Sequence, residues 1–231
     1  MRSATMESQL LEQCLHAAAP DFNRLARIYR WMEWLSFGPF LMRCRCAFLS
    51  LLSNRHAGLV LGDGDGRFTA RLLRENPSIT IDAVDASGAM LEELGRRAGS
   101  SGCRLQTHFS DARAFLPERH DYDFVVTHFF LDCLTTAEVK SLATRLRAYA
   151  CDDAAWVLSE FAVPSSWYGR AVARPIISLL YRAFGWLTGL EIRDLPNHRR
   201  ALTQAGWIFQ QERKHLGGLL VSEIWRLNPR P

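Results

Sequence analysis

Residues 56–76, HAGLVLGDGDGRFTARLLREN, decide the fold of this chain. A short apolar run at 58–61 predicts a buried strand, a glycine-rich turn follows it, and an amphipathic helix is expected from Arg67. Glycines at alternate positions let a backbone approach a ligand closely, and the helix that starts beside them offers free N–H groups and a positive dipole end. The stretch therefore predicts a strand, a ligand-binding loop and a helix.

The same alternation of strand and helix patterns continues along the chain. Further strands are expected at 78–85, 103–111, 121–129 and 154–163. Helices are expected at 87–98 and at 135–150, the second of them capped by Thr135 or Thr136. Five strands separated by helices imply a parallel sheet with helices on both faces. Near the end, a helix ending at Gly206 and two strands joined at Gly217 and Gly218 predict a closing hairpin.

Composition excludes several classes of protein. A chain of 231 residues, 48% of them hydrophobic, can bury one substantial core. The net charge is +4, but the arginines are scattered among acids, so a dedicated nucleic-acid binder is not expected. The six cysteines lack the spacing of a metal site, and reduced thiols point to a cytoplasmic protein without a metal. Neither an export signal nor a membrane span is indicated.

An acid at the end of the second strand strengthens the ligand-binding interpretation of the loop. Asp85 follows Gly66 by nineteen residues, where a carboxylate can accept hydrogen bonds from both ribose hydroxyls of a nucleoside. An ordinary tight turn without a nucleotide is the alternative. A dinucleotide enzyme is disfavoured, because the third glycine comes one residue too early for Gly-x-Gly-x-x-Gly.

Four motifs in order make the chain resemble the class I S-adenosylmethionine-dependent methyltransferases, especially small-molecule enzymes of the quinone-methyltransferase type, over about residues 21–226. LGDGDG resembles motif I, AVDAS the acid-ended second strand, SDA at 110–112 the segment that faces the adenine amino group, and YDFVVTHFFLDCL the fourth-strand motif. The resemblance implies a Rossmann-like sheet of seven strands with an antiparallel last strand. It also implies S-adenosylmethionine as cofactor and S-adenosylhomocysteine as product.

On this resemblance the chain is one methyltransferase domain, 1–231. Its parts are a helical N-terminal cap at 1–53, divided at Gly38 and Pro39, a cofactor-binding core at 57–163, a helical insertion or lid at 164–195, and the last helix and closing hairpin at 196–231.

The resemblance also implies a set of cofactor-binding residues. They are Tyr29, Gly62, Asp63, Gly64, Gly66, Asp85, Ala86, Met90, Asp111, Ala112 and Thr127. The family usually carries an acid two residues before the first glycine, where this chain has Val60. Asp63 either replaces that acid or is a solvated turn residue. Met90 has core packing as its alternative, and Asp111 has a helix N-cap.

The reaction edge is expected at 127–132, beyond the carboxyl end of the fourth strand. THFF lacks the prolines of the Asn/Asp-Pro-Pro-aromatic motif, so methylation of an exocyclic base amine is disfavoured in favour of an O, C, S or other N nucleophile. His128 is the candidate general base, oriented by Asp132 or Glu160, and a hydrogen-bonded core histidine is the alternative. The candidate substrate-contacting residues are His128, Phe129, Tyr168 and Arg199.

These observations favour methyl transfer by in-line displacement to a small-molecule acceptor. A cofactor-binding regulatory protein without turnover is a second hypothesis, because Val60 stands where the acid is expected. A third is a membrane-surface methyltransferase of quinone-like or lipid acceptors, because tryptophan, leucine and arginine recur at 167–190. No nucleic-acid partner is expected, and the oligomeric state is left open.

Overall fold

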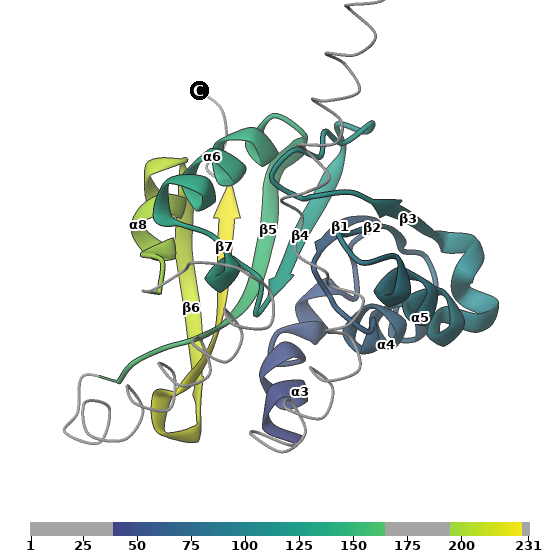
Figure 1. Ribbon diagram of the computed structural model, residues 1–231, viewed down its shortest axis with the longest axis horizontal. Helices are drawn as coiled ribbons and strands as arrows, with labels where there is room; N and C mark the ends of the chain where they lie inside the picture. Colours follow the sequence, from purple (N-terminus) through teal and green to yellow (C-terminus); the bar gives the residue numbers. More distant parts are fainter. Residues whose placement is uncertain (1–38, 165–194, 228–231) are drawn as a thin grey trace, which may run out of the picture.

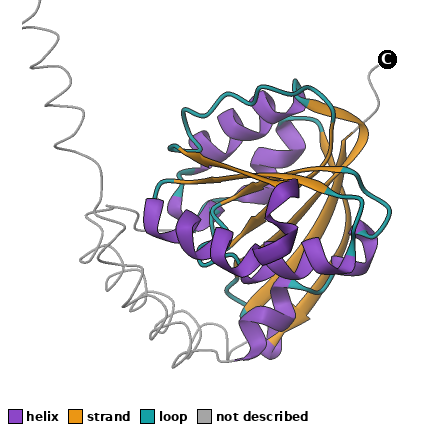
Figure 2. Cartoon of the chain, turned by 90° about the vertical axis from the view of Figure 1, so that its right-hand side faces the viewer, coloured by secondary structure: helices purple, strands orange, loops and turns teal. Residues whose placement is uncertain are grey.

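The structure is a computed structural model that describes residues 39–164 and 195–227. Within these residues, one seven-stranded sheet lies between two layers of helices (Figures 1 and 2). The strands are β1 (Ala57–Leu61), β2 (Thr80–Asp85), β3 (Leu105–Phe109), β4 (Tyr122–His128), β5 (Ala150–Phe161), β6 (Trp207–His215) and β7 (Leu220–Leu227). The α-helices are α3 (Pro39–Arg45), α4 (Arg67–Glu75), α5 (Gly88–Ala98), α6 (Thr136–Arg147) and α8 (His198–Gln204). Short 3-10 turns are η1 (Leu49–Leu52), η2 (Gly99–Arg104), η3 (Leu131–Cys133) and η5 (Leu216–Gly218).

The strands are ordered β3-β2-β1-β4-β5-β7-β6. The first five pair in parallel, whereas β7 runs antiparallel to both β5 and β6. The expected sheet of seven strands with an antiparallel last strand is confirmed, as is the closing hairpin with its turn at η5. All five residues of β1 are buried, because helices cover both faces of the sheet, and this explains its continuous apolar run.

Two hydrophobic clusters fill the two faces of the sheet. One contains Trp156, Trp207 and Trp225 and lies under α6 and α8. The other contains Phe68 and Phe124 and lies under α4 and α5. The sheet therefore has a separate core on each side, as a doubly wound fold requires.

Thr135, of the two threonines proposed as caps, is the one that caps α6. Its side chain accepts a hydrogen bond from the backbone of Glu138, and the Glu138 carboxylate accepts one from the Thr135 N–H at 2.8 Å. This reciprocal pair is a capping box. It fixes the start of the helix that follows the reaction edge.

Helix α3 is hydrogen-bonded to strands β5 and β7 of the sheet. The backbone carbonyl of Cys44 accepts hydrogen bonds from the hydroxyls of Ser222 on β7 at 2.6 Å and Ser159 on β5 at 3.3 Å. From α3 (Pro39–Arg45) the chain continues through η1 to β1. These contacts place the end of α3, at Arg45, beside the carboxyl ends of the central strands.

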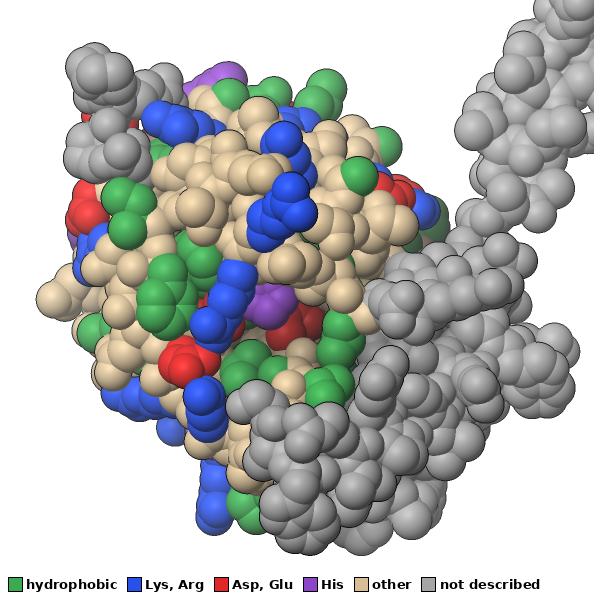
Figure 3. Space-filling view, turned by 90° about the vertical axis from the view of Figure 1, so that its left-hand side faces the viewer, with side chains coloured by type: hydrophobic (Ala, Val, Ile, Leu, Met, Phe, Trp, Pro, Cys, Tyr) green, Lys and Arg blue, Asp and Glu red, His purple; other side chains and the backbone are tan. Residues whose placement is uncertain are grey.

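The described surface carries mixed charge. Seen from the side on which α8 and β6 lie in Figure 1, basic, acidic and apolar side chains are interspersed (Figure 3). None of the helices at 39–164 and 195–227 is long and apolar enough to cross a membrane. The first part of the predicted cap and nearly all of the predicted insertion lie outside the described residues, so their boundaries remain predictions.

Candidate functional site

A pocket lies at the carboxyl ends of β1, β2, β3 and β4. The sequence-predicted residues that line it are Gly62, Gly64, Asp85, Ala86, Met90, Asp111, Ala112, His128 and Phe129. They come from four separate loops that meet at one edge of the sheet, where ligands of doubly wound folds bind. Tyr29 and Tyr168 lie outside the described residues, and their roles stay predictions.

The three glycines of the loop perform three different tasks, although all have positive φ angles between 63° and 75°. A Cβ on Gly62 would lie 2.4 Å from the ring of Phe130, so this position permits close packing of β1 against the turn after β4. A Cβ on Gly66 would lie 2.4 Å from the side chain of Leu94, so Gly66 lets α4 pack on α5. Gly64 has no neighbour within 4 Å of such a Cβ and lines the pocket.

Asp63 is not a solvated turn residue. It is buried, and one carboxylate oxygen accepts a hydrogen bond from the Thr69 N–H at 2.9 Å, near the start of α4. The other oxygen is buried and has no hydrogen-bond partner among the described residues. Burial raises the pKa of Asp63 to about 6, and the charge of Arg45 opposes that rise. Asp63 therefore lies behind the loop as a buried acid and does not itself line the pocket.

Asp85 ends β2 with its carboxylate held in place. It accepts a hydrogen bond from the Ser87 N–H at 2.8 Å, and Ser87 in turn caps α5. Burial raises the pKa of Asp85 to about 6. The carboxylate thus lies at the pocket wall at a fixed position, as ribose recognition would require.

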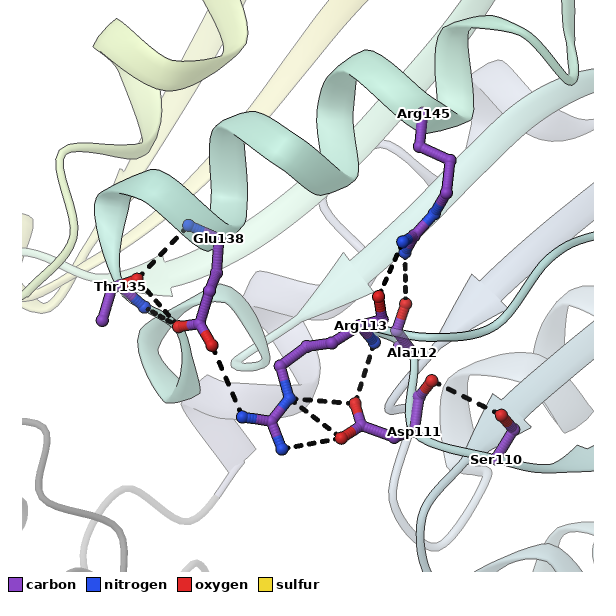
Figure 4. Close-up of polar contacts among 7 residues, drawn as sticks. All are labelled: Ser110, Asp111, Ala112, Arg113, Thr135, Glu138 and Arg145. Carbon is purple, nitrogen blue, oxygen red and sulfur yellow. Dashed lines mark hydrogen bonds and ion pairs between the residues drawn. The ribbon is translucent and has the colours of Figure 1, made fainter.

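The loop after β3 is stabilised by an ion-pair network (Figure 4). The Arg113 guanidinium contacts the Asp111 carboxylate at 2.6 Å and Glu138, of the α6 capping box, at 3.4 Å. Burial alone would raise the pKa of Asp111, but the hydrogen bonds and charge of Arg113 outweigh it and lower the pKa. Asp111 also accepts a hydrogen bond from the Arg113 backbone at 2.8 Å, so it both caps this turn and lines the pocket.

Arg145 of α6 fixes the backbone of the same loop. Its two terminal nitrogens donate hydrogen bonds to the carbonyls of Ala112 and Arg113, each at 2.6 Å (Figure 4). We expect Arg145→Met to lower the free energy of unfolding by about 2 kcal/mol, because two charge-assisted hydrogen bonds are lost. Urea unfolding measures this loss, and Arg74→Met, at an exposed arginine of α4, is the control. Equal stabilities of the two variants would contradict the role given to Arg145.

His128 ends β4 and lines the pocket in an unusual state. It is buried, and its ring meets Phe68 edge to face at 4.5 Å between centroids. Neither ring nitrogen has a hydrogen-bond partner among residues 39–164 and 195–227. Burial and then the charge of Arg45 lower the pKa of His128 well below its usual value, so the ring is neutral. Within the described part of the chain, the hydrogen bond of the core-histidine alternative is thus not formed.

The hydrogen bond expected from Asp132 or Glu160 to His128 is not formed. Glu160 is buried, and its carboxylate accepts a hydrogen bond from the Leu131 N–H at 3.0 Å, with the N–H groups of Phe130 and Asp132 close by. Burial and the charge of Asp132 raise the pKa of Glu160 well above its usual value. Glu160 therefore supports the turn after β4, and Asp132 does not line the pocket.

Two further predicted residues lie elsewhere. Thr127 accepts a hydrogen bond from the Trp156 indole at 2.9 Å, because alternate residues of a strand face opposite sides and Thr127 faces the α6 side. Arg199 forms ion pairs with Glu212 and, at 2.7 Å, with Glu223 on β7. Neither residue lines the pocket, and Arg199 is committed to the α8 side of the sheet.

Several residues that line the pocket were not named individually as candidate site residues. They are Arg45, Val84, Ser87, Ser110, Arg113, Phe130, Cys133 and Leu134. All but Arg45 and Arg113 lie within the motifs quoted from the sequence, and Arg113 directly follows one of them. Arg45 could not have been found by extending a motif, because contacts between α3 and the distant strands β5 and β7 bring it to the pocket.

The fold and the site agree with the resemblance that the sequence motifs indicate. A seven-stranded sheet in this order, a glycine-rich loop after β1 and an acid at the end of β2 are the features expected of a class I methyltransferase fold. Residues 59–150 match the family model described as "Methyltransferase domain".

Solved structures share this fold. They include the mitomycin 7-O-methyltransferase MmcR, with 13% identity over 82% of this chain and 54% of that chain and a TM-score of 0.65. A putative O-methyltransferase from Nostoc punctiforme PCC 73102 has 17% identity over 90% and 61%, with a TM-score of 0.68. N-methyltransferase NodS from Bradyrhizobium japonicum WM9, in complex with S-adenosylhomocysteine, has 13% identity over 82% and 84%, with a TM-score of 0.57.

The chain thus spans about half the length of MmcR and 61% of the Nostoc protein. No curated protein sequence matches it. A methyltransferase-domain model thus matches residues 59–150, and solved methyltransferases share the fold of this chain.

Proposed function

We propose that this chain is a class I S-adenosylmethionine-dependent methyltransferase, which transfers the methyl group of that cofactor by in-line displacement to a small-molecule acceptor. The observation that carries the proposal is the composition of the pocket end beyond Gly62, where Phe129, Phe130, Cys133 and Leu134 form an aromatic and apolar wall. Such a wall suits a flat or partly apolar molecule. One solved structure with this fold is a mitomycin 7-O-methyltransferase, and this supports a small-molecule acceptor.

Positioning of the acceptor is proposed as the main source of catalysis. Holding a nucleophile in line with the sulfonium removes much of the barrier by itself. His128 is neutral with a lowered pKa, which makes it a weak base, and no described carboxylate hydrogen-bonds its ring. The proposed acceptor atom is therefore an O, C, S or non-exocyclic N atom. It is already nucleophilic when the acceptor binds and needs no deprotonation by the protein.

The function is tested by incubating the protein with methyl-labelled S-adenosylmethionine and a fractionated metabolite extract that also contains an RNA fraction. We expect label in one small-molecule fraction, with an equal amount of S-adenosylhomocysteine formed. Asp85→Asn serves as the matched control with impaired cofactor binding. Label in the RNA fraction would overturn the acceptor class, and cofactor binding without any labelled product would overturn catalysis in favour of a regulatory protein.

We further propose a cytoplasmic location for the protein. In the described part of the chain, Cys44, Cys46, Cys103, Cys133 and Cys151 are free thiols. Unpaired thiols are typical of reducing compartments.

A further inference from the structure

Arg113 lines the pocket directly after Asp111 and Ala112, in the turn that is expected to face the adenine of the cofactor. Its guanidinium contacts the Asp111 carboxylate through two nitrogens. Nε lies 3.1 Å from Oδ1 and 2.9 Å from Oδ2, and a terminal nitrogen lies 2.6 Å from Oδ2. The Arg113 backbone N–H donates a further hydrogen bond to Oδ1 at 2.8 Å. Three N–H groups of one residue therefore hold this carboxylate (Figure 4).

These three donors leave the Asp111 carboxylate with room for one more hydrogen bond. A carboxylate has about four acceptor positions, two on each oxygen, and the three N–H groups occupy three of them. The Asp111 side chain is 43% exposed and lines the pocket, so a ligand can reach the remaining position. The hydrogen bonds and charge of Arg113 lower the pKa of Asp111, which keeps the carboxylate ionised. An ionised carboxylate only accepts hydrogen bonds, so the remaining position suits an amino group and repels a carbonyl oxygen.

Helix α6 holds Arg113 in place from two of its turns. In the first turn, the Glu138 carboxylate contacts the Arg113 guanidinium at 3.4 Å and also completes the capping box with Thr135. In the last turn, Arg145 donates hydrogen bonds to the carbonyls of Ala112 and Arg113, each at 2.6 Å. The turn after β3 is thus fixed by contacts within the protein. A ligand need not order it on binding, which favours affinity and selectivity.

We propose that Arg113 is the positioning residue for base selection. It holds the Asp111 carboxylate so that one oxygen accepts the 6-amino group of adenine and rejects a purine that carries a 6-oxo group. The contact of Asp111 with adenine is what the motif resemblance implies, whereas its dependence on Arg113 follows from the hydrogen bonds of this turn. The inference rests on the proposed function, because it requires the adenine of the cofactor to lie at Asp111.

The test compares three ligands that differ only in the purine base. Calorimetric titration uses S-adenosylhomocysteine, its deaminated analogue S-inosylhomocysteine, and the analogue with a hydrogen atom at position 6. In Arg113→Met we expect the affinity for S-adenosylhomocysteine to fall about 10-fold, because a hydrogen bond to a charged group loses its fixed geometry. The 6-hydrogen analogue donates nothing to Asp111 at this position, so its affinity should stay unchanged. The preference for the 6-amino over the 6-oxo ligand should therefore decrease.

Two matched variants control the experiment. Arg119 forms a similar pair with Asp121, at 2.8 Å and also two residues apart, but does not line the pocket. Arg119→Met should therefore leave all three affinities unchanged. Arg113→Lys keeps the positive charge without the planar fork and should recover only part of the lost affinity. The Arg113 side chain is 45% exposed, so both of its variants are expected to remain folded, which their thermal unfolding curves check.

The outcomes separate this inference from the proposed function. Equal binding of S-adenosylhomocysteine by Arg113→Met and the unaltered protein, or equal losses for all three ligands, would overturn the role of Arg113 and leave cofactor binding intact. Tighter binding by Arg113→Met would also overturn it, because Arg113 would then compete with the base for Asp111. Full recovery in Arg113→Lys would mean that charge alone suffices, against positioning by the fork. No binding of any ligand by the unaltered protein would overturn the function and this inference together.

Discussion

Gly66→Ala is expected to lower the free energy of unfolding by about 3 kcal/mol. The residue has a φ of +75°, and an L-residue in that region costs about 1–2 kcal/mol. Its new Cβ would also lie 2.4 Å from the Leu94 side chain and 2.8 Å from the Leu94 Cα, and the backbone of α5 cannot move aside cheaply. Overpacking of this kind adds about 1–3 kcal/mol. The total is a large part of the stability of a typical domain.

Gly64→Ala is the control, since it has the same conformational cost without the collision. Its φ is +63° and its Cβ would meet nothing within 4 Å. We expect a loss of stability of about 1–2 kcal/mol, measured by urea unfolding beside the Gly66 variant. Because Gly64 lines the pocket, its methyl group should also weaken binding of S-adenosylhomocysteine. Equal destabilisation by the two substitutions would contradict the division of tasks among the glycines.

Asp85→Asn is expected to weaken the binding of S-adenosylhomocysteine by a factor on the order of 100 to 1000. The carboxylate would otherwise accept charge-assisted hydrogen bonds from both ribose hydroxyls. Asparagine can still accept the Ser87 N–H that Asp85 accepts at 2.8 Å, so the turn is preserved. Calorimetric titration measures the affinity, and a change smaller than about threefold would contradict ribose recognition by Asp85.

The pH dependence of protein stability and of cofactor affinity provides a control for the Asp85→Asn variant. Burial raises the pKa of Asp85 from 3.8 to about 6, so the folded protein holds this proton more tightly than the unfolded chain. The carboxyl group's contribution to stability is therefore favourable below pH 3.8 and is lost as the pH rises through about 6. At neutral pH the ligand-free Asp85→Asn protein should be at least as stable as the unaltered one. Cofactor affinity of the unaltered protein should fall as the pH drops below about 6.

The fold was predictable because local patterns and tertiary structure agree in most of the chain. The central strands are buried on both faces and therefore appear as continuous apolar runs, as β1 illustrates. The one choice left open at α6, between Thr135 and Thr136, is decided by Glu138, which lies three residues after Thr135 and completes its capping box. The sequence alone was therefore sufficient to identify Thr135 as the cap of α6.

The candidate site was predictable only where its residues follow a strand directly. Asp85 and Asp111 lie at such ends and line the pocket, whereas Thr127 faces the opposite side of the sheet from His128. Thr127 lies on the α6 side, with Trp156, because successive side chains of a strand point to opposite faces of the sheet. Arg199 was a candidate substrate contact because it follows the segment rich in arginine and aromatic residues, whereas the structure shows it paired with Glu223.

The attachment of α3 to β7 has a consequence for how the protein is made. The Cys44 carbonyl receives its hydrogen bond from Ser222, a residue that leaves the ribosome 178 positions later. Domains form as units during synthesis, and contacts between distant segments wait for the later one. A nascent chain that already contains all of residues 59–150 therefore still lacks a seated α3. The part of the pocket that contains Arg45 is therefore complete only after β7 has been synthesised. We expect the cofactor to bind only once the whole sheet has formed.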